Sequence, residues 1–240
     1  MKVEGRNSVY ELLKTDKEID KVLVQKDLQD EASKMLINVI RSHKVKVQVV
    51  DKRVIEKESE SKHSQGFIAF VSDYKYFDLE DILDGCKDKD GFVVVLNEIL
   101  DPHNLGSIIR VCECAGVDGI VISKDRSASV NDTVMRISEG SLNHIKVARV
   151  TNINNAIDKL KDEGFWVYGA EIGGESIYSA DLTGKLCLVI GGEDSGVKRL
   201  TKTKCDKIVS IPMFGKVNSL NASVACGVAV YEAVRQRTVK

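Results

Sequence analysis

Five short, continuous apolar runs occur beyond residue 90, and segments with helical spacing separate most of them. Continuous apolar runs of this length are typical of strands that are buried on both faces of a parallel sheet. Their alternation with helices predicts an α/β domain with a mostly parallel sheet. The runs lie at 92–96, 119–122, 165–169, 186–190 and 208–211, and the helical patterns at 105–115, 130–142, 153–163 and 219–237.

The first 72 residues predict a smaller α/β unit that precedes this domain. Its strand patterns lie at 21–24, 45–49 and 66–71, and its clearest helical pattern lies at 28–42. Residues 73–90 then hold seven acidic residues and three lysines, a net charge of −4. We interpret this segment as an acidic linker with one short helix, and we expect domains at 1–72 and 91–240.

No apolar run approaches the roughly 18–20 residues that a membrane span needs. The first residues also contain no apolar stretch of the signal-peptide kind, so we expect a soluble, cytoplasmic protein without a membrane partner. The six cysteines are scattered and form no C-x-x-C pair, and the four histidines add no converging spacing. We therefore expect reduced cysteines that pack in the core, and no metal site.

Three loops that follow the expected strands are the places to search for chemistry, because ligands bind outside the carboxyl ends of strands in open α/β sheets. In the first loop, Pro102 stiffens the turn, Asn104 is a good N-cap for the next helix, and Arg110 follows within two turns. An ordinary cap followed by a surface arginine explains this loop equally well.

In the second loop, Gly191 and Gly192 end a strand and allow the backbone to approach a ligand closely. A simple turn is the alternative.

In the third loop, Pro212 follows a strand, and Ser219 or a neighbour caps the last helix. That helix is rich in small residues, which ordinary core packing explains as well as a subunit contact does. Dinucleotide, P-loop and nucleophile-elbow motifs do not occur.

In this order and spacing, the three loops resemble the signature motifs of the SpoU (TrmH-like) RNA 2′-O-ribose methyltransferases of the SPOUT superfamily. The motifs are Asn104-x-Gly106-x-x-x-Arg110, Gly191-Gly192-Glu193-x-x-Gly196 and Ile211-Pro212-Met213 with Asn218-Ser219-Leu220-Asn221. The N-terminal segments Gly5-Arg6-Asn7-Ser8-Val9 and Ser64-Gln65-Gly66-Phe67 are similar to the L30e-like substrate-binding domain of the 23S ribosomal RNA guanosine-2′-O-methyltransferase group.

The resemblance implies a parallel sheet with a C-terminal trefoil knot, and a homodimer formed through the last helix. It implies S-adenosylmethionine as the cofactor, and methylation of a ribose 2′-hydroxyl in RNA, most specifically of a guanosine in 23S ribosomal RNA. The implied cofactor contacts are Gly191, Gly192, Ile211, Met213 and Leu220.

The resemblance also implies roles for residues that would act on the substrate. Arg110 would stabilise the developing alkoxide and position a phosphate, and Glu193 would orient Arg110 through a bidentate pair. Asn104 and Asn221 would position the ribose, the phosphate and Arg110, while Ser219 would hold the loop or the substrate.

The net charge of −1 hides a basic segment at 196–216, which has six cationic residues and one acid. A basic stretch alone is usually a solvated face, but its place between the second and third motifs favours contact with RNA phosphates. Two alternatives stay open: a transfer-RNA 2′-O-methyltransferase, and an RNA-binding or ribosome-assembly protein of the same fold that lacks catalysis.

Overall fold

The computed structural model describes residues 1–238 apart from 16, 62, 73, 193–195 and 218. It divides into two compact units, Met1–Lys75 and Tyr76–Lys240. Within the described residues, no helix combines the length and the apolar character that crossing a bilayer requires.

The first unit is a four-stranded sheet with the order β1-β4-β2-β3, in which only β2 and β3 are parallel. Side chains of α1 and α2 share one apolar cluster with β2 and β4, and Ile55 of α3 packs with Leu23 and Ile68 in another. The elements are β1 (Lys2–Glu4), α1 (Arg6–Leu12), β2 (Glu18–Gln25), α2 (Glu31–Ser42), β3 (Val47–Val50), α3 (Lys52–Glu58) and β4 (Phe67–Ser72).

The second unit is built on a six-stranded sheet with the order β10-β8-β9-β5-β6-β7, and each neighbouring pair is parallel. The predicted α/β class and parallel C-terminal sheet are therefore confirmed. The strands are β5 (Phe92–Asn97), β6 (Gly119–Ser123), β7 (Lys146–Val150), β8 (Trp166–Ser176), β9 (Leu186–Gly191) and β10 (Lys207–Ser210). The helices are α4 (Leu79–Asp84), α5 (Pro102–Cys114), α6 (Asp132–Ile137), α7 (Ile153–Asp162), α8 (Arg199–Lys204) and α9 (Ala222–Thr238), with 3-10 turns η1 (Ser141–Asn143) and η2 (Ile177–Ser179).

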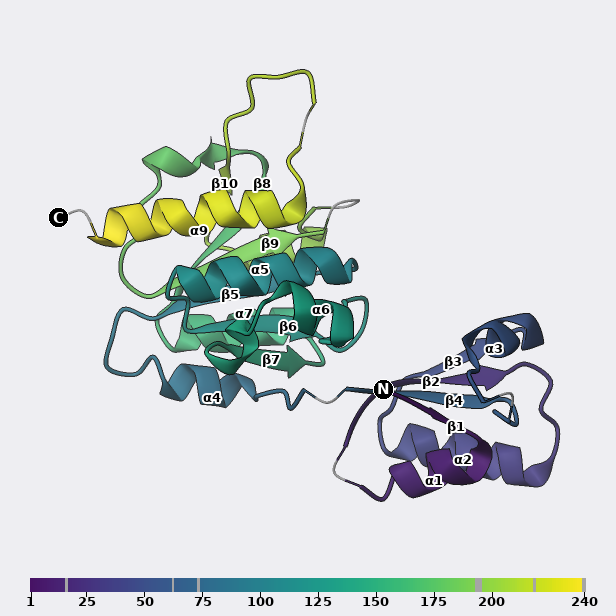
Figure 1. The fold of residues 1–240 in the computed structure, drawn as a ribbon. Coiled ribbons are helices and arrows are strands. Elements are labelled where there is room, and N and C mark those ends of the chain that lie inside the picture. Colours follow the sequence, from purple (N-terminus) through teal and green to yellow (C-terminus); the bar gives the residue numbers. More distant parts are fainter. Residues whose placement is uncertain (16, 62, 73, 193–195, 218, 239–240) are drawn as a thin grey trace. The chain divides into compact units, whose positions relative to one another are not determined.

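Helices cover both faces of this sheet (Figure 1). Successive strand residues point to opposite faces, and Val93 and Val95 of β5 pack in one cluster with α4 and α7. On the other face, α5 and α9 lie side by side in contact. All six residues of β5 are buried, which is why the strand reads as a continuous apolar run.

The order of the strands indicates the edge of the sheet at which a ligand site is expected. From β5 the chain builds outward through β6 and β7, and it then returns on the other side of β5 to form β8, β9 and β10. The direction of building therefore changes at the pair β5 and β9. In open parallel sheets, this is where the carboxyl ends of the strands leave a crevice.

The acidic segment that the sequence predicts as a linker is different in the structure. From residue 76 it belongs to the second unit, and α4 buries Leu79, Ile82 and Leu83 in the cluster with α7. A Cβ at Gly119 would lie 2.5 Å from the Cδ1 atom of Ile82, so β6 and α4 are in close contact. The charges stay at the surface while every third or fourth residue is apolar, so an overall drop in hydrophobicity concealed a packed helix.

Two other elements differ in length from the prediction. The helix expected over 130–142 ends at Ile137, because Glu139 and Gly140 both take positive φ angles just after the C-cap Ser138, and a 3-10 turn follows. The strand expected over 165–169 continues to Ser176, beside β10. The trefoil knot implied by the resemblance stays a prediction.

Because Ile82 is buried in the core of the second unit, we expect Ile82→Ala to lower the free energy of unfolding by about 2–5 kcal/mol. The single tryptophan, Trp166, lies in β8 and reports on this unit, so urea titration followed by its fluorescence measures the loss. Leu200→Ala is the matched control, since Leu200 is exposed on α8; its effect should stay within about 0.5 kcal/mol. Equal effects of the two substitutions would show that α4 is not part of the core.

Candidate active site

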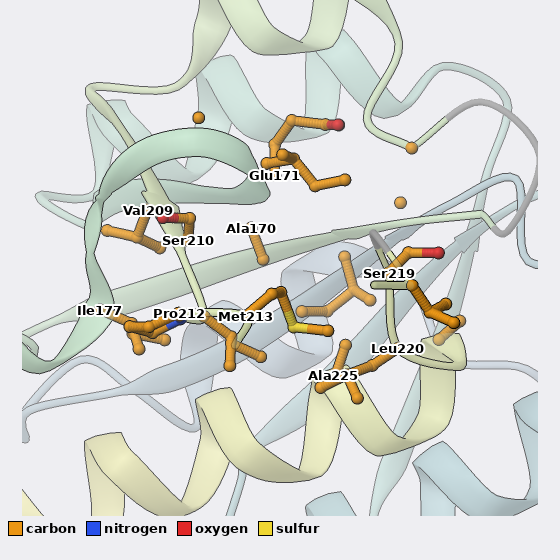
Figure 2. Close-up of a pocket in the computed structure, with 18 of the residues that line it drawn as sticks. Ala170, Glu171, Ile177, Val209, Ser210, Pro212, Met213, Ser219, Leu220 and Ala225 are labelled. Atoms are coloured by element: carbon orange, nitrogen blue, oxygen red, sulfur yellow. The ribbon is translucent and has the colours of Figure 1, made fainter. Parts of the chain in front are cut away.

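A pocket of about 760 Å³ lies at the carboxyl ends of β8, β9 and β10 and reaches the start of α9. Figure 2 shows its walls: Ala170 and Glu171 from β8, Ser210 and Met213 at and after β10, and Leu220 before α9. The residues that the resemblance assigns to the cofactor all line it, and so does Ser219. They are Gly191, Gly192, Ile211, Met213 and Leu220. Their contact with a cofactor remains a prediction.

The two glycines at the end of β9 are required by close packing of the backbone. A Cβ at Gly191 would lie 2.1 Å from the carbonyl carbon of Gly196, and one at Gly192 would lie 2.3 Å from the carbonyl oxygen of Glu98. Real Cβ atoms do not approach backbone atoms so closely, so any larger residue would push these segments apart. The amide of Gly192 also donates to the carbonyl of Asn97 at 2.9 Å. The glycines thus fix the shape of the pocket floor.

Glu171 is a pocket residue that the sequence analysis missed. Its side chain is 17% exposed, and its Oε2 accepts a hydrogen bond from the amide of Val197 at 2.7 Å. The same oxygen lies 3.2 Å from Nζ of Lys202. A Cβ at Gly196 would lie 2.3 Å from Oε2, so that glycine leaves room for the carboxylate. The expected strand ended at 169, and an acid just beyond a strand gave no signal of a role.

Asn104 and Asn221 come together although 117 residues separate them. Asn104 is not the N-cap that the sequence predicts: Asp101 caps α5 by accepting from the amide of His103, Pro102 occupies the first turn, and Asn104 is buried within the helix. Its Oδ1 accepts a hydrogen bond from Nδ2 of Asn221 at 3.0 Å. The first and third motifs therefore meet through an amide pair.

Asn221 also fills the position at the start of α9 that the sequence assigned to Ser219 or a neighbour. Its Oδ1 accepts from the amide and the hydroxyl of Ser223, at 2.9 and 2.6 Å. One side chain thus caps α9 with its oxygen and holds α5 with its nitrogen.

Arg110 lies on the exposed side of α5, and it does not line the pocket. Its Nη1 is 3.0 Å from Oε1 of Glu139, which is itself exposed. An ion pair this exposed contributes little to stability, so Arg110 can exchange this partner for another anion. Glu193, which the resemblance pairs with Arg110, lies outside the described residues.

The basic segment at 196–216 is largely paired with acids from other elements. Four of its six cations form ion pairs: Lys198 with Glu98 at 2.9 Å, Lys202 with Glu171 at 3.2 Å, Lys204 with Asp158 at 2.7 Å and Lys207 with Glu175 at 3.1 Å. Arg199 and Lys216 form no ion pair with any residue that the structure describes. The local excess of positive charge is therefore smaller on the surface than in the sequence.

The cysteines pack as the sequence predicts: four of the six are buried. A hydrogen bond to Cys226 together with burial raises the pKa of the Cys112 thiol, and burial raises that of Cys187. Such thiols are protonated and unreactive near neutral pH. Over the described part of the chain, no group of three or more His, Cys, Asp or Glu side chains is placed to hold a metal ion.

Replacing Asn221 tests its double role. We expect Asn221→Ala to lower the free energy of unfolding by about 0.5–2 kcal/mol, because the cap of α9 is lost. Asn221→Asp keeps an oxygen that can cap α9 but loses the Nδ2 donor to Asn104, so its loss should be smaller than that of Asn221→Ala and should reflect the amide pair alone. Urea titration of Trp166 fluorescence measures both, with Asn155→Ala, an exposed asparagine of α7, as the control. Equal losses in the alanine and aspartate variants would contradict the capping role.

Comparison with known protein families gives two matches that together cover most of the chain. A model of the SpoU rRNA methylase family matches residues 91–231. A model described as RNA 2′-O ribose methyltransferase substrate binding matches residues 2–77.

Individual relatives agree with these matches. A protein of Staphylococcus aureus strain COL, whose name describes a TrmH family tRNA/rRNA methyltransferase, is 40% identical over 240 residues, or 98% of this chain and 96% of its own. The solved structure of the SpoU methyltransferase AviRb from Streptomyces viridochromogenes in complex with AdoMet is 25% identical, with a TM-score of 0.63 over 98% of this chain and 90% of that one. The TrmH/SpoU tRNA modifying enzyme of A. aeolicus is 30% identical, with a TM-score of 0.56 over 66% of this chain and 83% of that one.

A family model that spans more than half of the chain, and a relative with 40% identity over nearly its whole length, show that this chain belongs to the SpoU (TrmH) family of RNA methyltransferases.

Proposed function

We propose that this protein transfers the methyl group of S-adenosylmethionine to a ribose 2′-hydroxyl of RNA, specifically that of a guanosine in 23S ribosomal RNA. The observation that supports the reaction most directly is the pocket at the strand ends, whose walls come from the loops of the second and third motifs. The related AviRb structure holds AdoMet.

The lining of the pocket fits this cofactor. Ile211, Met213 and Leu220 provide apolar surfaces that can enclose a flat adenine, and the glycine backbone of 191–192 provides hydrogen-bonding groups without side chains. The carboxylate of Glu171 suits a ligand that carries sulfonium and ammonium charges. When bound, S-adenosylmethionine supplies the electrophilic methyl carbon, so the protein has only to align and activate the ribose hydroxyl.

Arg110 is the residue that we assign to the reacting oxygen. A guanidinium stays protonated in proteins, so it does not act as the base. It can bind a substrate phosphate in place of Glu139 and stabilise negative charge that develops on the 2′-oxygen. The proposed bidentate pair with Glu193 would then hold its orientation. Asn104 and Asn221 would position the ribose and phosphate, and Ser219, at the pocket wall, would hold the loop or the substrate.

We also propose that the protein forms a homodimer through α9 and acts in the cytoplasm. Val224 and Tyr231 are 50% and 48% exposed on α9, and Gly227 and Val228 lie between them at helical spacing. Together these four residues make an apolar stripe that a second copy could cover.

The substrate-binding unit supports ribosomal RNA as the substrate, since an added RNA-binding domain suits a large folded target. Transfer RNA is the alternative, because the name of the S. aureus relative includes both substrates. The other alternative is an RNA-binding or ribosome-assembly protein of the same fold that lacks catalysis. The presence of Arg110, Glu193 and Asn221 in the sequence argues against it.

Methyl transfer from labelled S-adenosylmethionine to total RNA from cells that lack the gene tests the proposal. We expect label on 23S ribosomal RNA at a ribose. Label on transfer RNA alone would support the alternative substrate. Absence of both transfer and cofactor binding would contradict the enzyme assignment.

Arg110→Ala should reduce the turnover number for methyl transfer by about 100- to 1000-fold, because the alkoxide loses a charged donor. Its affinity for S-adenosylmethionine, measured by calorimetry, should be unchanged, since Arg110 does not line the pocket. Glu139→Ala removes the partner of Arg110 and is the control that should retain transfer. A large loss of cofactor affinity in Arg110→Ala would assign this residue to the cofactor instead.

Glu171→Ala should weaken S-adenosylmethionine binding about tenfold, because the amide of Val197 and the ammonium of Lys202 lose their shared carboxylate. Glu171→Gln keeps an oxygen that can accept from Val197 but loses the negative charge, so it should recover only the part of the affinity that the shape of the pocket supplies. The control is Glu175→Ala. Glu175 lies on β8, as Glu171 does, and its carboxylate pairs with Lys207 of β10. If Glu171→Ala binds the cofactor as tightly as the unaltered protein, Glu171 does not shape the pocket.

A further inference from the structure

Phe214 is the most exposed large apolar side chain of the described residues. Its side chain is 98% exposed, in the long loop that joins β10 to α9 (Figure 1). The residues on both sides of it, Met213 and Gly215, line the pocket, whereas Phe214 itself does not. The phenyl ring therefore stands at the rim of the pocket and contributes no packing to the fold of this chain.

Lys216, two residues further on, is the second part of this rim. It is exposed and forms no ion pair within the described chain, unlike Lys198, Lys202, Lys204 and Lys207 of the same basic segment. No acidic residue occurs between 211 and 220. The rim thus presents an exposed aromatic ring and, two residues further along the same loop, a lysine without an ion-pair partner among the described residues.

An RNA duplex displays its 2′-hydroxyls in the minor groove, but a base offers its face to a side chain only when its nucleotide leaves the helical stack or lies in a single strand. Nucleotides in that state expose the faces of their bases, and proteins bind such bases by stacking on aromatic side chains and bind their phosphates with cations. Stacking on a phenyl ring and pairing with a lysine are the two interactions that this rim can offer.

We propose that Phe214 and Lys216 form a nucleotide-binding subsite, in which Phe214 stacks on an unpaired base next to the methylated nucleotide and Lys216 binds a phosphate of the same strand. The proposal rests on the proposed function and adds to it a requirement for single-stranded RNA at the pocket. A second copy of the chain fits this rim less well, because an interface there would enclose Lys216 without a carboxylate in its own loop. The apolar stripe on α9 lets a second copy bind without burying an unpaired lysine.

The test uses the full chain and a fluorescein-labelled RNA oligonucleotide, either as a single strand or in its duplex. The affinity of each variant is measured by fluorescence anisotropy. We expect Phe214→Ala to weaken binding of the single strand about 5- to 150-fold, the loss expected for one stacked base. Phe214→Tyr should bind as the unaltered protein does, and Phe214→Leu should stay weak because leucine is apolar but has no π face.

Three control measurements distinguish a loss of stacking from a general loss of structure in the Phe214 variants. The affinity for S-adenosylmethionine should be the same in all Phe214 variants. Trp166→Ala removes another large exposed aromatic, at the amino end of β8, and should leave RNA binding unchanged. The duplex should bind equally to Phe214→Ala and to the unaltered protein.

Lys216→Ala tests the phosphate contact. The slope of log Kd against log salt concentration should fall by about 0.7 for the single strand, the value for one phosphate. Lys204→Ala is the matched control, because Lys204 already pairs with Asp158, and its slope should not change.

Three results would overturn the proposal. Full recovery of affinity in Phe214→Leu would mean an apolar contact without stacking. Unchanged RNA affinity in Phe214→Ala, with a shift from dimer to monomer in sedimentation, would mean that a second copy covers the ring. Unchanged affinity without that shift would leave the ring outside the substrate path. These outcomes are independent of the proposed reaction, which fails only if the unaltered protein transfers no methyl group to any RNA.

Discussion

Backbone-to-backbone packing at the carboxyl end of β9 is the constraint on which the rest of the site depends. Gly191 and Gly192 lie so close to Gly196 and Glu98 that no side chain fits between them. This packing occurs where the building of the sheet changes direction, between β5 and β9. The pocket lies beside this point, at the ends of β8, β9 and β10, and it therefore has a floor of main-chain atoms from β9. Side chains from β8, β10, the loop before α9 and the start of α9 form its walls.

Two polar links hold the walls around this floor. Glu171 joins β8 to the amide of Val197 and to Lys202 on α8. Asn221 joins α9 to Asn104 on α5. Each link uses one side chain for two partners, so one substitution loosens two elements. The residues that we propose to meet the substrate, Arg110, Phe214 and Lys216, are by contrast exposed, and Arg110 has a surface ion pair that contributes little to stability.

Charge is where local sequence and tertiary structure differ most. The segment 196–216 has a net charge of +5 in the sequence, yet four of its lysines face carboxylates from β8, α7 and the loop after β5. The opposite charges within each pair largely cancel, so the pair exerts only a weak electrostatic field beyond a few ångströms. Among the described residues, Arg199 and Lys216 are the cations of this segment without a carboxylate partner, and under the proposed function they are the ones left to contact RNA.

The sequence by itself determined the α/β class, the parallel sheet and the loops that contain the pocket residues. It could do so because burial on both faces makes strands continuously apolar, and because glycine and proline mark sharp turns at strand ends. Only the tertiary structure decided that α4 belongs to the core, that Asn104 bonds to Asn221 instead of capping α5, that Glu171 enters the pocket and that most lysines of the basic segment are paired. The physical reason is distance along the chain: local patterns register periodicity and turn chemistry, whereas these contacts join residues far apart in sequence whose partners no local pattern specifies.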